Sequence, residues 1–163
     1  MPKTSLFTRS YPRDSPQAAG RLVALALISN GEIKASEWAM LYELQAREQL
    51  GLSGLEWHDI VDGLCAELLA TAREHAECRI DGATLARWFA EVVHPDLRRL
   101  VLHLSAELIA ADGHVEEGES VVLRGAIEHW VLPDDDQARY TPMLYGLDFQ
   151  VQPRPTARLA GAC

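Results

Sequence analysis

The segment LIAADGHVEEGESVVL, residues 108–123, decides the fold because a second copy of its pattern, ALISNGEIKASEWAML, occupies residues 26–41. In both copies an Asp or Asn precedes a Gly, a β-branched residue follows two positions after that Gly, and then come a Glu and a Leu at intervals of four residues. The matched pairs are Asn30 with Asp112, Gly31 with Gly113, Ile33 with Val115, Glu37 with Glu119, and Leu41 with Leu123. This internal repeat predicts two copies of one supersecondary unit.

Each copy has the chemistry of a tight turn between two helices. Gly adopts the left-handed backbone conformation that ends a helix, and the preceding Asp or Asn can hydrogen-bond to its own backbone. The Glu falls in or near the first turn of the next helix, where the helix dipole favours an anion. Each copy therefore predicts an αα-hairpin with a polar turn. We name these turns the first elbow, residues 30–37, and the second elbow, residues 112–119.

Helical signals extend outward from both hairpins along most of the chain. Ser15 with Pro16 forms a helix start, Ser53 with Glu56 forms a capping box, and Asp81 caps a further helix. Apolar residues recur at intervals of three and four, and no segment alternates as a strand would. The expected helices run from residue 16 to the first elbow, over 35–50, from 53 to about 77, over 82–93, from 95 to the second elbow, over 116–131, and within 134–146.

These signals predict an all-α fold: a compact single-domain bundle of about seven helices that contains two repeated αα-hairpins. The expected organisation is a flexible arm at 1–15, the helical domain at 16–150, and a disordered tail at 151–163. Tryptophans and one cysteine fall on or near the apolar stripes, and we expect all of them to pack in the core: Trp38, Trp57, Trp88, Trp130 and Cys65.

The composition limits the function. The net charge of −9 disfavours nucleic acid as a partner, because phosphate binding needs clustered Lys and Arg. The three cysteines form no Cys-x-x-Cys pair, which argues against a disulfide framework or a zinc ribbon. The first residues lack the apolar core of a signal peptide, and no apolar stretch approaches the about 18–20 residues that span a bilayer. We therefore expect a cytoplasmic protein without a transmembrane segment.

The stretch HPDLRRLVLHLSAELIAADGHVEEGESVVLRGAIEHWVL, residues 94–132, resembles the signature of the TerB-like (tellurite resistance) family. That signature has a proline-containing helix start, an apolar helix ending in Ala-Asp-Gly, and then a Val and a Glu before a further helix. The resemblance covers residues 21–133, although the first copy matches more weakly. It implies an all-helical domain, a role in stress or tellurite resistance, a divalent metal at acidic clusters in some members, and kinship with a domain of membrane-anchored J-domain co-chaperones. The sequence departs from the pattern at Asn30, where an Asp is expected, and at His114.

Both elbows carry groups that can bind a cation. The candidate ligands are Asp112, His114, Glu116, Glu119, Asn30 and Glu37. Carboxylate oxygens suit calcium or magnesium, and a histidine extends the choice to zinc or manganese. The alternative is a helix cap followed by a solvated acidic turn that binds no ion. Any cofactor is therefore expected to be one of these four divalent cations.

The sequence contains no nucleophile elbow, P-loop or His-Glu-x-x-His motif, so we expect a non-enzymatic interaction module. Glu91 and His94 form one Glu-x-x-His, which di-iron bundles need twice, and we interpret it as coincidence. The alternative is a metal-dependent enzyme that uses Asp112 and Glu119. We expect another protein as the partner. The sequence leaves open whether that protein is met at a membrane surface and whether the chain forms a homodimer. Direct tellurite binding, for example at the arginines 98–99, is disfavoured by the negative charge.

Overall fold

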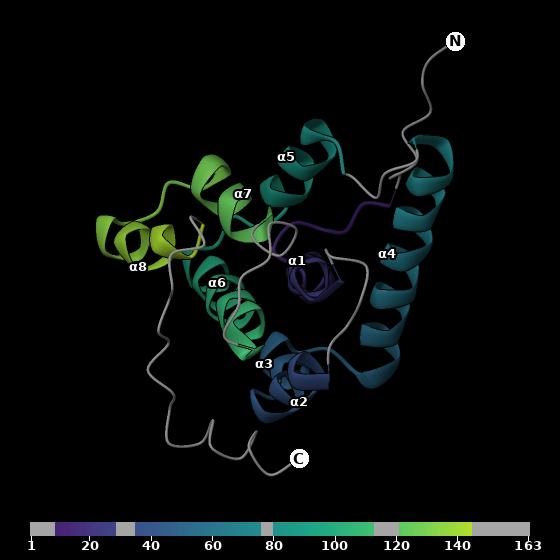
Figure 1. Cartoon of the computed structure of the whole chain (residues 1–163), viewed down its shortest axis with the longest axis horizontal. Coiled ribbons are helices and arrows are strands. Elements are labelled where there is room, and N and C mark those ends of the chain that lie inside the picture. The colour runs from purple at the N-terminus through teal and green to yellow at the C-terminus, as the bar shows by residue number, and fades with distance from the viewer. Residues whose placement is uncertain (1–8, 29–34, 76–79, 113–120, 145–163) are drawn as a thin grey trace.

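The computed structural model describes residues 9–28, 35–75, 80–112 and 121–144, and the descriptions below concern these residues. Every regular element among them is helical, which confirms the all-α fold class (Figure 1). The elements are α1 (Pro16–Ile28), α2 (Ala35–Glu43), α3 (Ala46–Leu50), α4 (Gly54–His75), α5 (Gly82–Ala90), α6 (Pro95–Ile109), the 3-10 turn η1 (Ala110–Asp112), α7 (Val121–His129) and α8 (Asp134–Leu144).

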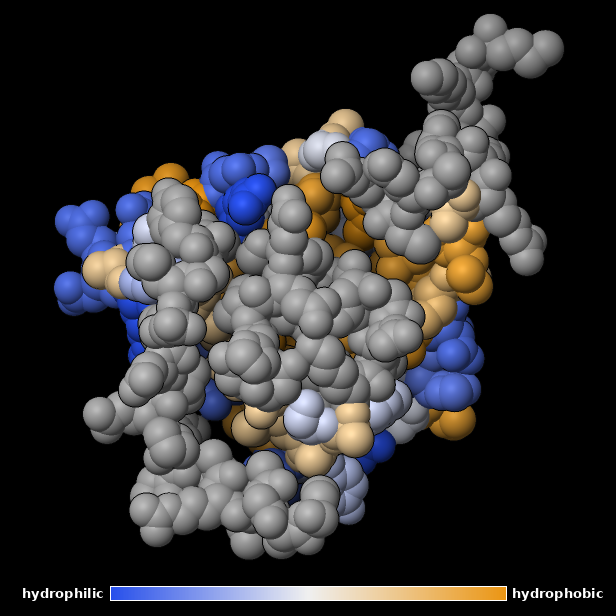
Figure 2. Space-filling view, viewed as in Figure 1, coloured by the Kyte–Doolittle hydropathy of each residue, from blue (hydrophilic) through white to orange (hydrophobic). Residues whose placement is uncertain are grey.

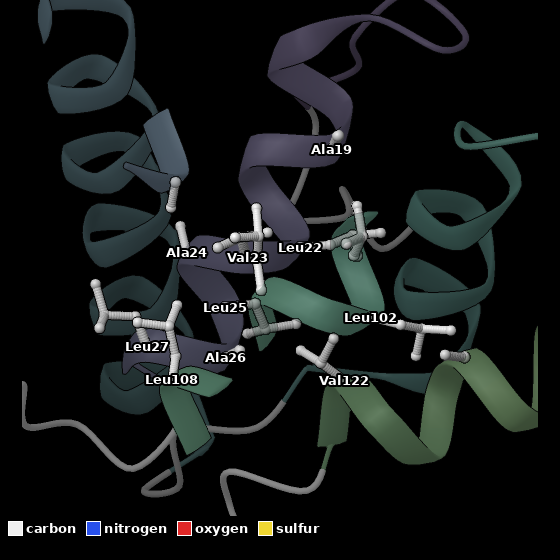
Figure 3. Close-up of a cluster of buried hydrophobic side chains, with 14 of the residues drawn as sticks. Ala19, Leu22, Val23, Ala24, Leu25, Ala26, Leu27, Leu102, Leu108 and Val122 are labelled. Atoms are coloured by element: carbon white, nitrogen blue, oxygen red, sulfur yellow. The ribbon is translucent and has the colours of Figure 1, made fainter. Parts of the chain in front are cut away.

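Helix α1 lies at the centre of the molecule, with α4, α5, α6 and α7 around it (Figure 1). Its sequence is apolar on nearly every side, and every residue from 18 to 28 is buried. Figure 3 shows its side chains among Leu102 and Leu108 of α6 and Val122 of α7. A helix without a polar face is stable only when neighbours cover it all round. The predicted start of α1 is confirmed, because the Ser15 Oγ accepts a hydrogen bond of 3.1 Å from the Ala18 N–H.

The helices of the two repeats pack against each other reciprocally. The first helices of the repeats, α1 and α6, form the most extensive helix–helix contact of the described residues. In addition α1 contacts α7, and α6 contacts α2. Each repeat thus places its first helix against both helices of the other, which is the arrangement expected of two hairpins related by an approximate twofold axis.

The helix expected over 35–50 is divided into α2 and α3, and the described residues therefore hold eight α-helices rather than about seven. Gln45 separates the two with a left-handed backbone, at φ 48° and ψ 43°. The reason is burial. In one straight helix, at about 100° per residue, Leu41 and Leu50 would lie on opposite faces. The break turns the chain so that both leucines reach the core, where they are 8% and 5% exposed.

The caps predicted for the next two helices are confirmed. At the start of α4 the Glu56 carboxylate accepts from the Ser53 N–H at 2.8 Å, and the Ser53 Oγ accepts from the Glu56 N–H at 3.2 Å. At the start of α5 the Asp81 carboxylate accepts from the Thr84 N–H at 2.9 Å. These bonds satisfy backbone donors that the first turn of a helix leaves unpaired, so local chemistry fixes where both helices begin.

Three of the four tryptophans lie in the core as expected, and Trp38 does not. Trp57, Trp88 and Trp130 are buried, and the Trp130 indole donates a 2.9 Å hydrogen bond to the Phe89 carbonyl. Trp38 is 47% exposed, so its expected place in the core was wrong. Both residues lie on α2, three positions apart, and the core covers Leu41 but only half of Trp38.

Candidate functional site

The structure describes only the edges of the two elbows. Outside the described residues lie Asn30, His114, Glu116, Glu119 and the side chains of Glu37 and Asp112. The backbone of Glu37 belongs to α2 and that of Asp112 to η1, and these two elements contact each other. The described flanks of the two elbows therefore meet. Elsewhere in the described residues, no three His, Cys, Asp or Glu side chains are grouped to hold a metal. The cation site at the elbows stays a prediction.

A groove of about 290 Å³ lies where α2, α3 and the start of α4 meet, and we call it the aromatic groove. Its lining residues are Trp38, Leu41, Tyr42, Gln45, Arg47, Glu48 and Trp57. In Figure 2 the surface over α2 and α3, at the lower edge of the molecule, shows apolar residues beside hydrophilic ones. The sequence pattern missed this groove, because it predicted Trp38 in the core.

Backbone turns on either side of α3 shape the aromatic groove. The left-handed residue Gln45 begins α3, and Gly51, at φ 77°, ends it with its N–H donating to the Glu48 carbonyl at 3.0 Å. Glycine is favoured at such a φ because it has no Cβ to clash with the backbone. The short α3 therefore crosses between α2 and α4 and carries Arg47 and Glu48 to the rim of the groove.

Arg47 and Glu48 form an ion pair at that rim, with 2.6 Å between Nη2 and Oε1. The hydrogen bond from Arg47 lowers the pKa of the Glu48 carboxyl. Arg47 also lies over Gly54, where an added Cβ would come within 2.7 Å of its Nη1. Glu48 and Gly54 therefore position the Arg47 guanidinium. The exposed Glu48 carboxylate balances the charge of Arg47, so the rim carries no net positive charge from this pair.

The aromatic rings of the groove differ in exposure. Tyr42 is 87% exposed and Trp38 is 47% exposed, whereas Trp57 is only 7% exposed. The Trp57 Nε1 is buried and has no hydrogen-bond acceptor among the described residues. The benzene edge of its indole faces α1, because a Cβ added at Gly20 would lie 3.9 Å from Cζ3. Its Nε1 edge therefore points away from α1. The groove combines two exposed rings with one buried donor that lacks an acceptor.

A second set of aromatic and charged side chains lies inside the molecule, and we call it the closed cluster. Arg21 of α1 is 2% exposed, with its guanidinium carbon 4.7 Å from the Tyr11 ring centroid and 4.4 Å from that of Trp88. It forms an ion pair with Glu91 and donates a 2.8 Å hydrogen bond to the Arg9 carbonyl. Burial lowers the pKa of Arg21, and the Glu91 carboxylate opposes that shift. The charge is therefore held by two rings, a carboxylate and a carbonyl.

The closed cluster fastens residues 9–14 onto the helices. The Asp14 carboxylate accepts from the Val93 N–H at 2.6 Å and from the His94 N–H at 2.8 Å, and the Asp14 N–H donates to the Glu91 carbonyl at 2.8 Å. The hydrogen bonds from His94 and Val93 lower the pKa of the Asp14 carboxyl. This part of the expected arm is thus bound to the loop between α5 and α6.

Other sequence candidates have structural partners. Glu91 pairs with Arg21, and the His94 Nδ1 accepts from the Asp96 N–H at 3.3 Å at the start of α6. These contacts account for the Glu-x-x-His without a di-iron role. In the pair 98–99, the Arg98 Nε donates to the Val92 carbonyl at 2.9 Å and the Arg99 guanidinium lies 3.9 Å from the Asp96 carboxylate. Both arginines therefore already have partners within the chain, which makes this pair a poor site for an anion such as tellurite.

Comparison with known proteins gives no relative from which a function could be read. No family model, curated protein or solved structure matches this chain. Within the described residues, no helix is at once long enough and apolar enough to cross a bilayer. The function has to be argued from the aromatic groove itself.

Proposed function

We propose that this chain is a non-enzymatic interaction module of the TerB-like type, and that it binds a partner protein in the aromatic groove. The observation that supports the proposal is the exposure of Trp38 and Tyr42 beside the buried Trp57. Trp and Tyr are the residues most enriched at the centres of protein interfaces, because each buries a large area on binding and loses little side-chain entropy. The exposed parts of Trp and Tyr side chains contribute little to the stability of the fold, so a binding partner accounts better for their position at the surface.

The size of the groove supports a protein partner over a cofactor. Its volume of about 290 Å³ lies at the lower limit of the about 300–1,000 Å³ typical of small-molecule sites. A space of this size fits one or two large side chains of a partner. The polar lining residues Arg47 and Glu48 satisfy each other, and no pair in the groove resembles an acid–base or nucleophile–base arrangement.

The resemblance adds a role in stress or tellurite resistance and a divalent cation at the elbows. In this proposal the module acts in the cytoplasm, where its cysteines stay reduced. The Cys65 thiol fits that setting, because burial, and then the charge of Asp62, raises its pKa and makes it a weaker nucleophile. The contact between α2 and η1 would connect a cation at the elbows with the helix that carries Trp38 and Tyr42.

Selection from a library of short random peptides tests the groove. Peptides retained by the wild-type chain are counter-selected on the Trp38→Ala,Tyr42→Ala double variant, and Val131→Ala serves as the matched control because Val131 is 94% exposed outside the groove. We expect peptides that bind the wild type and the control but lose at least about tenfold in affinity on the double variant. A library that yields no such peptide would refute the proposal.

Calorimetry tests the cation. Metal-stripped protein is titrated with calcium, magnesium, zinc and manganese, and the titration is repeated with Asp112→Ala. We expect micromolar binding of one ion that the variant loses. If none of the four ions gives a binding signal, the elbows are helix caps that bind no cation, and the groove proposal is unaffected.

A further inference from the structure

We infer that the occupant of the aromatic groove is an extended basic peptide that inserts a large apolar side chain, presents a backbone carbonyl to Trp57, and places a Lys or Arg beside Trp38 and Tyr42. This inference rests on the proposed function and specifies the chemistry of the partner. Three features of the groove support it: its charge, its buried donor and its exposed rings.

The groove is built from an acidic part of the chain. Residues 35–62, which form α2, α3 and the start of α4, contain six Asp or Glu and one Arg, so this segment carries −5 of the total −9. The one arginine, Arg47, is paired with Glu48. Among the six acidic residues, Glu48 lines the groove and Glu43 is exposed directly after the lining residue Tyr42. Opposite charge steers association and penalises acidic competitors, so a basic peptide fits this surface.

The exposed rings favour a cation as well as an apolar contact. The face of an aromatic ring carries partial negative charge and attracts a guanidinium or ammonium group within about 6 Å. Among the described residues no arginine lies over Trp38 or Tyr42, whereas Arg21, Arg98 and Arg139 each lie over another ring. An incoming Lys or Arg would combine ring contact with the nearby carboxylates.

The buried donor favours an extended backbone over a helix. Trp57 is more than nine-tenths buried, lines the groove, and has no acceptor for its indole N–H among the described residues. A buried donor without an acceptor is unfavourable, because it has lost the hydrogen bond that water would give it. An extended peptide offers a carbonyl at every residue, whereas a helix uses all its carbonyls internally except those of its last turn. A carbonyl that reached Nε1 would satisfy this donor.

The test uses the groove-dependent peptides from the selection above, measured against the full chain. Each peptide is synthesised in three forms: as selected, with every Lys and Arg changed to Gln, and with every Lys and Arg changed to Glu. We expect the Gln form to bind about tenfold more weakly, the Glu form to show no binding, and the difference between forms to shrink at high salt. Glu43→Gln should weaken only the basic form, by about threefold.

Trp57→Phe removes the indole N–H and keeps an aromatic ring, and we expect it to weaken all basic peptides by about tenfold. The indole proton resonance of Trp57 gives a readout that does not require a stable variant. It should move downfield when the peptide binds, because a carbonyl then accepts its hydrogen bond. The resonance of Trp130, whose N–H already has an acceptor in the Phe89 carbonyl, should stay unchanged and serves as the control.

The outcomes separate the two proposals. If the selection finds no groove-dependent peptide, the proposed function fails and this inference fails with it. If such peptides exist but bind equally well in the Gln form, or leave the Trp57 indole resonance unmoved, the interaction module stands and only the basic extended occupant is overturned. A groove-dependent peptide that binds as a helix, shown by its circular dichroism, would also overturn it.

Discussion

The closed cluster and the aromatic groove use the same side-chain chemistry in opposite states. In the closed cluster, the Arg21 guanidinium lies between two rings and against the Glu91 carboxylate, all supplied by the chain itself. In the groove, the rings of Trp38 and Tyr42 face outward beside acidic residues, and no described arginine covers them. The difference teaches that this fold can hold a cation between rings and a carboxylate, and it motivates the proposal that the open rings of the groove receive a partner.

The two regions should therefore respond oppositely to mutation, and the largest effect is expected at Arg21. Arg21→Ala leaves Glu91, only 10% exposed at its side chain, without its charged partner and empties the space between Tyr11 and Trp88. We expect a loss of about 3–5 kcal/mol in the free energy of unfolding, measured with urea. Arg99→Ala is the matched control, because its ion pair with Asp96 is exposed, and it should change stability by less than about 1 kcal/mol. Similar losses for both variants would contradict a closed, structural role for Arg21.

A smaller, pH-dependent effect is expected at Asp14, which fastens residues 9–14 beside the closed cluster. Hydrogen bonds from the His94 and Val93 N–H groups lower the pKa of this carboxyl in the folded state below its ordinary value of 3.8. A lowered folded-state pKa adds stability above the unfolded-state pKa, and that stability is lost as the pH falls through the folded-state pKa. Wild type should therefore exceed Asp14→Ala in stability at neutral pH, and the gap should narrow in acid below about pH 4 to the pH-independent cost of alanine at φ 56°. A gap that is constant over this range would show that the carboxylate charge plays no part.

The smallest effect on stability is expected in the groove. Tyr42→Ala should change the free energy of unfolding by about 0.5 kcal/mol or less, because Tyr42 is 87% exposed. Trp38→Ala should cost about 1–2 kcal/mol, because about half of that side chain is covered, and this is still less than the loss expected for Arg21→Ala. Each variant should weaken the binding of groove-dependent peptides, and the double variant should weaken it by at least about tenfold. Thermal unfolding and peptide titration on one protein preparation would measure both quantities. If either variant destabilised the chain as strongly as Arg21→Ala, the groove side chains would be part of the core. The proposed difference between the groove and the closed cluster would then be wrong.

Local chemistry predicted the helices and their starts well. Ser15, Ser53 and Asp81 cap the helices that they were expected to begin, because each cap bond joins residues three apart in sequence. The apolar run of α1 correctly predicted a helix buried on all sides. The single long helix over 35–50 was wrong, because helix propensity says nothing of which leucines the rest of the molecule will cover. The predicted ligands at the elbows fall outside the described residues and remain to be tested by titration.

By itself, the sequence determined the all-α class and the caps, since each depends on residues close together along the chain. Tertiary structure alone decided that α2 breaks from α3 at Gln45, that Trp38 and Tyr42 remain exposed, and that Arg21 is enclosed. The closed cluster joins residues as far apart as Tyr11 and Glu91, and such contacts leave no periodic signal in the sequence. Whether an aromatic ring is buried or open to a partner depends on which distant helices cover it, and only the packed molecule fixes that.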